Sequence, residues 1–310
     1  MASDPFNKDT NVSYGVTEVV APGVRRMTCP NPSPYTFTGT QTYLVGDRDL
    51  ALIDPGPDRG EHLDALLGSL DPGQRISHIL ITHSHNDHSP GAARVAAQTG
   101  AKIHAWGPHG AGLSPTMQRL VADGADIGGG EGGDVDFTPD VVLEDGDRLE
   151  GDGWAFEAIH TPGHLSNHLS FGLEGTGIVF TGDMVMGFAT TLVSPPDGDM
   201  AAFMASLDRL AGRSGDQVYL PGHGQAVEDP ASMVQYQIGH RQSRFDQILT
   251  ALGEGAADAT ALTQAIYTDI DPALLPAARR NVLASLIGLA DQGRVGCAGG
   301  ISVDAVFNLA

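Results

Sequence analysis

The stretch Ile79–Gly91, ILITHSHNDHSPG, decides the fold of this chain. An apolar run ends at Thr82, and polar residues follow until Pro90, a residue type that is typical of the first turn of a helix. Side chains two apart in extended backbone point the same way, so His83 and His85 can hold one cation together. Histidines gathered against a core would lack partners without such a cation, and the junction therefore predicts a metal site.

Further ligand types complete this pattern. Asp87 and His88 can present an oxygen and a nitrogen to a second cation beside the first. Three later turns each follow a β-type run and carry His164 in TPGH, Asp183 in TGD and His223 in PGHG. The predicted ligands are His83, His85 and His164 for one ion, Asp87, His88 and His223 for the other, and Asp183 as a bridge between them.

Imidazole and carboxylate ligands without thiolate favour two zinc ions, with manganese or iron as alternatives. Two ions about 3.5–4 Å apart lower the pKa of a shared water and deliver hydroxide at neutral pH, so the pattern predicts metal-assisted hydrolysis. We also name Asp87 and His168 as catalytic residues. His168 can line the substrate side of the site or orient a ligand, and plain strand packing is the alternative. The remaining histidines are expected on the surface or in the core: His62, His78, His104, His109, His160 and His240.

Short β-type runs alternate with helical patterns over residues 1–229, which predicts layered sheets and helices. The β-type runs are 40–45, 50–53, 78–82, 102–106, 154–159, 168–171, 178–180 and 218–220, and the helical patterns are 61–70, 90–98, 115–122 and 200–210. Residues 124–139, GADIGGGEGGDVDFTP, are rich in glycine and lack periodicity, so we predict a mobile surface loop there.

The pattern changes near Pro230. Helical patterns follow over 231–252, 258–267 and 272–290, and short strands are expected between Arg294 and Val306. Three helices and a terminal hairpin resemble a winged-helix module. We therefore divide the chain into a catalytic domain, residues 1–229, and a linking helix with a winged-helix-like domain, residues 230–310.

The segments THSHNDH, TPGH, TGD and PGHG, in this order, resemble the motif set of the metallo-β-lactamase superfamily. The resemblance implies an αββα sandwich that carries a binuclear site at one edge of its two sheets. The segments around these motifs are similar to beta-lactamase-like protein 2 and its bacterial relatives, a branch that ends in a small winged-helix domain. The family also implies that Asp54 supports the histidine cluster, although a turn-forming aspartate explains this residue locally.

Composition excludes several classes of protein. Among 310 residues, 41% are hydrophobic and 18% charged, as in globular proteins. The net charge of −21 repels polyanions and argues against a non-specific nucleic-acid binder. The first ten residues lack the features of a secretion signal and no apolar run approaches about 20 residues, so we expect a soluble cytoplasmic protein without a membrane partner. Cys29 and Cys297 are expected to be unpaired thiols.

The leading hypothesis is a metal-dependent hydrolase that acts on an ester, a thioester or a related small or carrier-linked substrate, because the resemblance includes thioesterases. A metal-dependent single-strand endoribonuclease is the alternative, but the charge disfavours RNA as a partner. A second alternative is a non-catalytic nucleic-acid-binding regulator with a structural metal site. Beyond Gly255, three arginines stand against five aspartates, and we expect Arg279 and Arg280 to lie on a solvated helix face. The module is expected to cover one wall of the active site or to support an oligomer interface.

Overall fold

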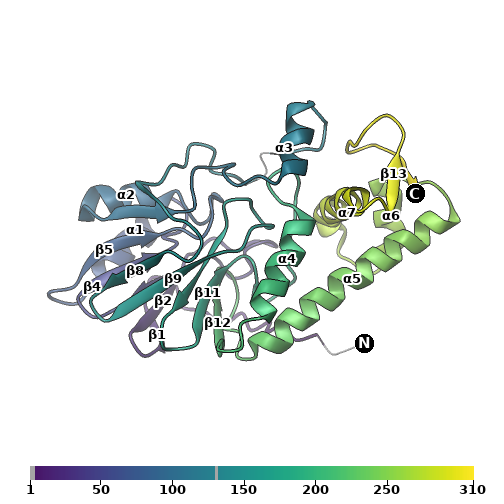
Figure 1. Ribbon diagram of the computed structural model, residues 1–310. Coiled ribbons are helices and arrows are strands. Elements are labelled where there is room, and N and C mark those ends of the chain that lie inside the picture. Colours follow the sequence, from purple (N-terminus) through teal and green to yellow (C-terminus); the bar gives the residue numbers. More distant parts are fainter. Residues whose placement is uncertain (1–3, 130–131) are drawn as a thin grey trace.

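The computed structural model of the chain describes residues 4–129 and 132–310. Its larger part is a pair of β-sheets packed face to face, with helices on both outer sides (Figure 1). One sheet has the order β1-β2-β3-β4-β5-β6-β7 and consists of β1 (Glu18–Ala21), β2 (Val24–Thr28), β3 (Gln41–Val45), β4 (Asp49–Ile53), β5 (Arg75–Leu80), β6 (Lys102–Ala105) and β7 (Val141–Val142). The other has the order β12-β11-β10-β9-β8 and consists of β8 (Arg148–Gly151), β9 (Trp154–His160), β10 (Leu169–Leu173), β11 (Ile178–Gly182) and β12 (Val218–Pro221).

Aromatic side chains fill the space between the two sheets. Phe156 packs edge-on against Phe171 and Phe180, with ring centroids 6.2 and 5.7 Å apart. Tyr43 reaches the same cluster from the opposite sheet, and its ring centroid lies 5.0 Å from that of Phe180. Each buried ring removes about 150–250 Å² from water, at roughly 25 cal/mol per Å², so these rings strongly stabilise the sandwich.

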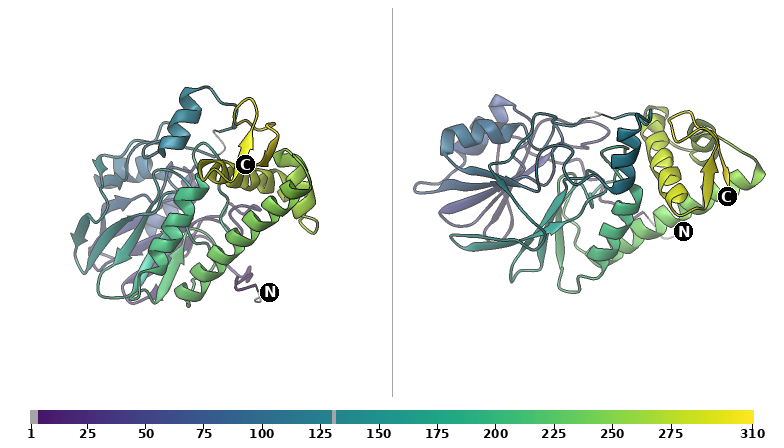
Figure 2. Two further views of the ribbon diagram at one scale, coloured as in Figure 1. Left: turned by 45° about the vertical axis from the view of Figure 1, so that its right-hand side comes forward. Right: turned by 45° about the horizontal axis from the view of Figure 1, so that its top comes forward.

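The helices α1 (Gly60–Gly68) and α2 (Gly91–Thr99) cover the outer face of the β1–β7 sheet, whereas α4 (Met200–Ala211) covers the other sheet (Figure 1). This arrangement confirms the predicted αββα sandwich. The helix α3 (Pro115–Ala122) lies apart from both outer layers, beside the C-terminal module (Figure 2). In the described residues, no helix is both long and apolar enough to cross a membrane.

Parallel strand pairs bring chemically active residues to one edge. Strands β4 and β5 run parallel in one sheet, and β11 and β12 run parallel in the other. The carboxyl ends of parallel strands meet at a common edge. Asp54 and His83 follow the first pair, and Asp183 and His223 follow the second, so topology alone places these four residues at corresponding strand ends.

The long helix α5 (Pro230–Glu254) runs obliquely from the sandwich to a small C-terminal module (Figure 1). The module contains α6 (Ala259–Ile266), the 3-10 helix η1 (Pro272–Leu274), α7 (Leu275–Asp291) and the paired strands β13 (Val295–Cys297) and β14 (Phe307–Leu309). Helices followed by a hairpin are the predicted winged-helix order. The predicted end of the hairpin at Val306 is wrong, because a loop with Gly299 and Gly300 at positive φ delays the second strand to Phe307.

The helix α5 belongs to both parts of the molecule. It begins at Pro230, where the sequence places the domain boundary. However, Met233 and Val234 on its first turns pack in one buried cluster with Phe203 of α4. The first half of α5 therefore contributes to the core of the catalytic part, and its second half packs with the C-terminal module.

Residues 124–139, predicted as a mobile surface loop, form no helix or strand in their described part and are mostly exposed, but two of these residues are held by other parts of the molecule. Ile127 is 1% exposed and packs in the same cluster as the C-terminal helices. The backbone N–H of Asp134 donates to the Ser84 carbonyl at 2.8 Å, beside the predicted ligands. Residues 130–131 lie outside the described residues. The sequence conceals these contacts because the surrounding glycines carry no side-chain pattern.

Phe307→Ala is expected to lower the free energy of unfolding by about 3–5 kcal/mol, because the Phe307 ring is fully buried among the helices of the module. The neighbouring control, Val306→Ala, changes a side chain that is 53% exposed and should alter it by less than about 0.5 kcal/mol. Denaturant titration followed by circular dichroism measures both. Similar small effects would contradict the packing of the hairpin on the helices.

Candidate metal centre

The predicted ligands lie together in two groups, although they are dispersed along the chain. Within each group, every residue offers one ligand atom, and these atoms lie within 4.8 Å of one another. The first group is His83, His85, His164 and Asp183, and the second is Asp87, His88 and His223. The structure thus brings together the residues that the motifs predict.

In the first group, imidazole nitrogens face each other at short range. Nε2 of His83 lies 2.9 Å from Nδ1 of His85, which in turn lies 3.0 Å from Nε2 of His164. The other nitrogens of the outer two rings are engaged: Nδ1 of His164 donates to the Leu192 carbonyl at 2.7 Å, and Nδ1 of His83 lies 3.0 Å from the Thr82 hydroxyl. Their Nε2 lone pairs therefore point inward, an arrangement that a cation stabilises.

The second group repeats this arrangement with an acid. Nε2 of His88 and Nε2 of His223 lie 3.2 Å apart. Oδ2 of Asp87 lies 3.1 Å from Nε2 of His223 and 3.5 Å from Nε2 of His88. Nδ1 of His223 donates to the Gly39 carbonyl at 3.2 Å, which directs Nε2 toward the group.

Asp183 contacts both groups. Its Oδ2 lies 3.6 Å from Nε2 of His164 and 3.3 Å from Nε2 of His223, and its Oδ1 lies 3.5 Å from Nε2 of His88. Within the described residues, Oδ1 is buried and has no hydrogen-bond partner. A buried carboxylate oxygen without a partner is costly unless a cation neutralises it. The donor set therefore fits bound metal, and the carboxylate of Asp183 lies between the two groups.

The histidines of the first group are prepared to bind metal at neutral pH. Burial lowers the pKa of His85 to about 3 and lowers the pKa of His164. Burial also holds the pKa of His83 well below its usual range, and the neighbouring rings of His88 and His85 add to the effect. These imidazoles are neutral at pH 7, which is the form that coordinates metal.

The second group is more strongly charged. Burial acts to lower the pKa of His223, but Asp183 and Asp87 outweigh it and raise this pKa to about 9. Burial also opposes the charge on His88, yet the same carboxylates hold its pKa well above the usual range. In the metal-free protein, protons on these two imidazoles therefore occupy the place of a cation.

Asp54 orients two of the histidines. Its Oδ2 accepts a hydrogen bond from Nδ1 of His88 at 2.9 Å and another from the Thr82 hydroxyl at 2.6 Å. That hydroxyl faces Nδ1 of His83 at 3.0 Å, so Asp54 supports His83 through Thr82. Asp54 adopts a φ of 47°, a costly conformation for a residue other than glycine. These contacts favour the supporting role that the resemblance implies over a purely turn-forming one.

His168 does not occupy the substrate side of the site. It is fully buried, and its Nε2 accepts the backbone N–H of Asp183 at 3.1 Å. Its Nδ1 lies 3.0 Å from the Thr161 hydroxyl, so both ring nitrogens are engaged. This placement disagrees with a catalytic role for His168 and fits the alternative in which it orients a ligand, here through the backbone of Asp183.

Two further residues at the site were not predicted. Gly222 leaves no room for a side chain, because a Cβ there would lie 2.4 Å from Oδ1 of Asp183. Gly222 is the first glycine of the PGHG motif, so the motif itself was the signal that could have predicted this close approach.

His109 was expected on the surface or in the core. Its Nδ1 lies 2.9 Å from the Ser84 hydroxyl, and its Nε2 lies 3.7 Å from Oδ1 of Asp197. Its isolation in the sequence gave no indication of this position.

Asp54→Asn is expected to weaken metal binding by about 10–100-fold, because an amide has one acceptor oxygen where the carboxylate uses two. The control is Asp58→Asn in the same loop, where the side chain pairs with Arg94 on the surface. Titration of the apoprotein with zinc against a competing chelator measures both affinities. Equal affinities in the two variants would contradict the role of Asp54.

Metal uptake by the apoprotein at pH 7 is expected to release about two protons, because His88 and His223 must lose theirs to coordinate. Metal affinity should therefore rise as the pH increases from 7 toward about 9, the pKa of His223. Calorimetry in buffers of different ionisation enthalpy measures the release. Uptake without any proton release would show that this group is not charged in the apoprotein.

Comparison with known protein families identifies the family of each part of the chain. Residues 35–223 match the model of the metallo-beta-lactamase superfamily, and residues 259–300 match the beta-lactamase associated winged helix domain. The first of these matches spans more than half of the chain and includes every residue of both groups. The second covers most of the C-terminal module, which confirms the winged helix.

Individual proteins extend the likeness. The beta-lactamase-like protein 2 homolog of Drosophila melanogaster is 27% identical over 290 residues, which cover 90% of this chain and 91% of the relative. An atrochrysone carboxyl ACP thioesterase of Aspergillus fumigatus is 30% identical over 268 residues, 81% of this chain and 75% of the relative. A crystal structure of a beta-lactamase domain protein from Burkholderia ambifaria, 21% identical, superposes with a TM-score of 0.80 over 97% of this chain and 96% of that one. The chain therefore belongs to the metallo-β-lactamase superfamily and is a metal-dependent hydrolase with a C-terminal winged-helix domain.

Proposed function

We propose that this chain is a binuclear hydrolase that cleaves thioesters or esters of small or carrier-linked acyl groups. The observation that carries the binuclear assignment is the position of Asp183, whose two oxygens lie within 3.6 Å of nitrogens from both groups. A second ion would take the place of the protons that His88 and His223 carry in the metal-free protein.

The donor set favours zinc, with manganese or iron as alternatives. When bound, a pair of such ions activates water at neutral pH and stabilises the negative charge that develops during hydrolysis. His83, His85 and His164 would hold one ion and His88 and His223 the other, together with the carboxylates of the two groups.

We assign Asp87 a second task besides coordination. Its side chain is 27% exposed, against 8% for Asp183, so solvent reaches this carboxylate. The Thr40 hydroxyl donates to its Oδ2 at 3.3 Å and orients it. We propose that the carboxylate of Asp87 accepts and passes on a proton during turnover.

The thioester assignment has three supports. A small pocket adjoins the first group and presents both apolar and polar surface, and its lining residues are His85, His164, Leu165, Leu192, Ser194 and Asp197. The Aspergillus fumigatus relative carries a thioesterase name and aligns over 81% of this chain. A neutral acyl group also suits a chain of charge −21 better than a polyanion does.

The structure offers little basis for a nucleic-acid-binding regulator. The prediction of a solvated arginine face on α7 is wrong for Arg280, which donates to the Ile127 carbonyl and the Ser194 hydroxyl. It holds in part for Arg279, whose side chain is 36% exposed and donates to the Val303 carbonyl and to Asp304. Guanidinium groups that are held by the chain itself do not present a basic face to phosphates.

His164→Ala and Asp183→Ala should each reduce turnover by more than roughly 100-fold. Loss of a residue that only hydrogen-bonds to a metal ligand costs up to about that much, and each of these substitutions removes a direct ligand. Both should also lower the metal content. The matched control is Asp199→Ala, which removes a helix-capping carboxylate of α4 outside the two groups. Hydrolysis is measured on a panel of acyl thioesters, esters, lactones, phosphodiesters and single-stranded RNA.

Full activity in either ligand variant would contradict the binuclear mechanism. The panel separates the substrate classes, because the proposal predicts EDTA-sensitive cleavage of thioesters or esters. Cleavage of RNA without thioester or ester cleavage would instead support the endoribonuclease alternative.

A further inference from the structure

We propose that Arg241 of α5 and Asn281 of α7 are positioning residues for the metal centre, and that they act through the backbone of residues 191–193. The inference rests on the proposed function, because it takes His164 and Asp183 as metal ligands. It assigns the C-terminal part of the chain a direct part in building the active site.

Residues 191–193 contact two ligands at once. The Leu192 carbonyl accepts the hydrogen bond from Nδ1 of His164 at 2.7 Å. The Thr191 hydroxyl donates to the backbone carbonyl of Asp183 at 2.7 Å. The segment lies in neither a helix nor a strand, so its position depends on hydrogen bonds to other parts of the molecule.

Asn281 and His164 hold opposite sides of one peptide group. The backbone N–H of Val193 donates to Oδ1 of Asn281 at 2.9 Å, and this N–H belongs to the same planar unit as the Leu192 carbonyl. Because the peptide unit is rigid, fixing its N–H also fixes the direction of its carbonyl. Asn281 thereby fixes the direction of the Leu192 carbonyl, which is the acceptor that orients the His164 ring.

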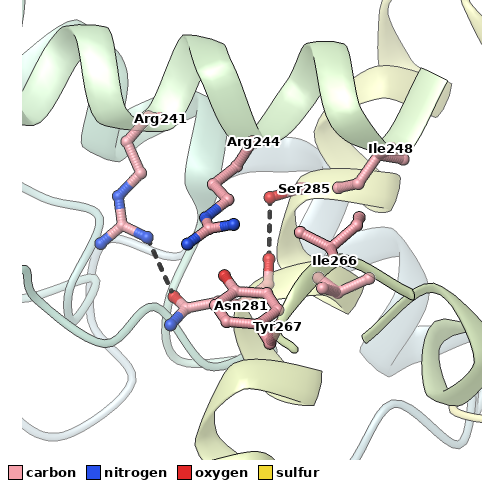
Figure 3. Close-up of a pocket in the computed structure, with 8 residues that line it drawn as sticks. Arg241, Arg244, Ile248, Ile266, Tyr267, Asn281 and Ser285 are labelled. Carbon is pink, nitrogen blue, oxygen red and sulfur yellow. Dashed lines mark hydrogen bonds between the residues drawn. The ribbon is translucent and has the colours of Figure 1, made fainter. Parts of the chain in front are cut away.

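Arg241 fixes the preceding peptide group. Its Nη2 donates to the Thr191 carbonyl, and its Nη1 donates to Oδ1 of Asn281 at 3.4 Å. Figure 3 shows Arg241 reaching from α5 toward Asn281, with a dashed line between them. One arginine and one asparagine thus connect the two C-terminal helices to the same three residues.

The environment of Arg241 indicates a specific role. Its side chain is buried, and within the described residues no carboxylate forms an ion pair with it. Burial lowers its pKa to about 10, so the guanidinium remains charged at neutral pH. Burying a charge without a counterion is costly, and the compensating contacts are the Thr191 carbonyl, Asn281 and the Phe203 ring 5.2 Å away.

The helix α7, which carries Asn281, also contacts the residues that follow 191–193 in the chain. Arg280, beside Asn281 on α7, donates to the Ser194 hydroxyl at 2.8 Å and to the Pro195 carbonyl. Leu192 and Ser194 both line the pocket next to the first group. The contacts of α7 therefore run continuously from the support of a ligand to the wall of the pocket, as expected of a module that covers one side of the site.

The chain supplies a matched control for these residues. Arg244 lies one turn beyond Arg241 on α5, and its guanidinium lies 4.2 Å from the centroid of the Tyr267 ring and donates to Gln247 (Figure 3). It borders the same group of helices and carries the same charge. Its contacts are internal to the C-terminal part, so its removal tests packing without disturbing residues 191–193.

The experiment compares cobalt binding by the full-length apoproteins of wild type, Arg241→Gln, Asn281→Ala, Asn281→Asp and Arg244→Gln. Affinity is measured against a chelator, the visible spectrum of bound cobalt reports ligand geometry, and thermal unfolding reports folding. Arg241→Gln and Asn281→Ala should bind cobalt about 10–100-fold more weakly with an altered spectrum. Asn281→Asp keeps an acceptor for Val193 and should restore both, and Arg244→Gln should match wild type.

Unchanged affinity and spectrum in folded Asn281→Ala would overturn this inference and leave the proposed function standing. An equal loss in Arg244→Gln would also overturn it, because the effect would then reflect packing of the module. Failure of the wild-type protein to bind cobalt would overturn the proposed function itself, and the inference with it.

Discussion

The structure depends on one electrostatic constraint. Imidazole and carboxylate groups are buried face to face at one edge of the two sheets, where they need cations between them. Nitrogens of His83, His85 and His164 approach within 3.0 Å, and an oxygen of Asp183 is buried without a hydrogen-bond partner among the described residues. Such a cluster is unfavourable by itself and favourable around cations. The parallel strands, the strained backbone of Asp54 and the absence of a side chain at Gly222 all serve to assemble it.

Much of this cluster was predictable, because each ligand belongs to a short sequence motif with a recognisable set of residue types. The motif from His83 to His88 sits at a strand-to-helix junction, and each later ligand follows a strand. The catalytic fold was predictable for the same reason, since alternating strand and helix patterns identify the layers. Short strands such as β2 were missed because their apolar patterns are weak.

The remaining features depend on contacts between distant segments. The acceptor that orients His164 is the backbone carbonyl of Leu192. Every residue has such a carbonyl, so the residue type does not indicate which one is used. Arg280 reads as a solvated surface residue in the sequence, yet it donates to the Ile127 carbonyl far along the chain. His168 stands four residues after a ligand, but its direction toward the backbone of Asp183 follows from strand pairing.

The two parts of the chain therefore form one functional unit. The sandwich supplies the ligands, and the C-terminal helices fix the irregular segment between β11 and α4 that supports them. This division explains why α5 shares a core with the sandwich before it reaches the winged helix. The pocket beside the first group is lined by residues of the sandwich part, and Arg280 of α7 donates to one of them, Ser194.

The binuclear site is tested most directly by a crystal structure of the zinc-loaded protein with anomalous data collected at the zinc absorption edge. Two anomalous peaks are expected about 3.5–4 Å apart, one beside each ligand group, with Asp183 between them. A single peak, or peaks away from these residues, would contradict the binuclear site.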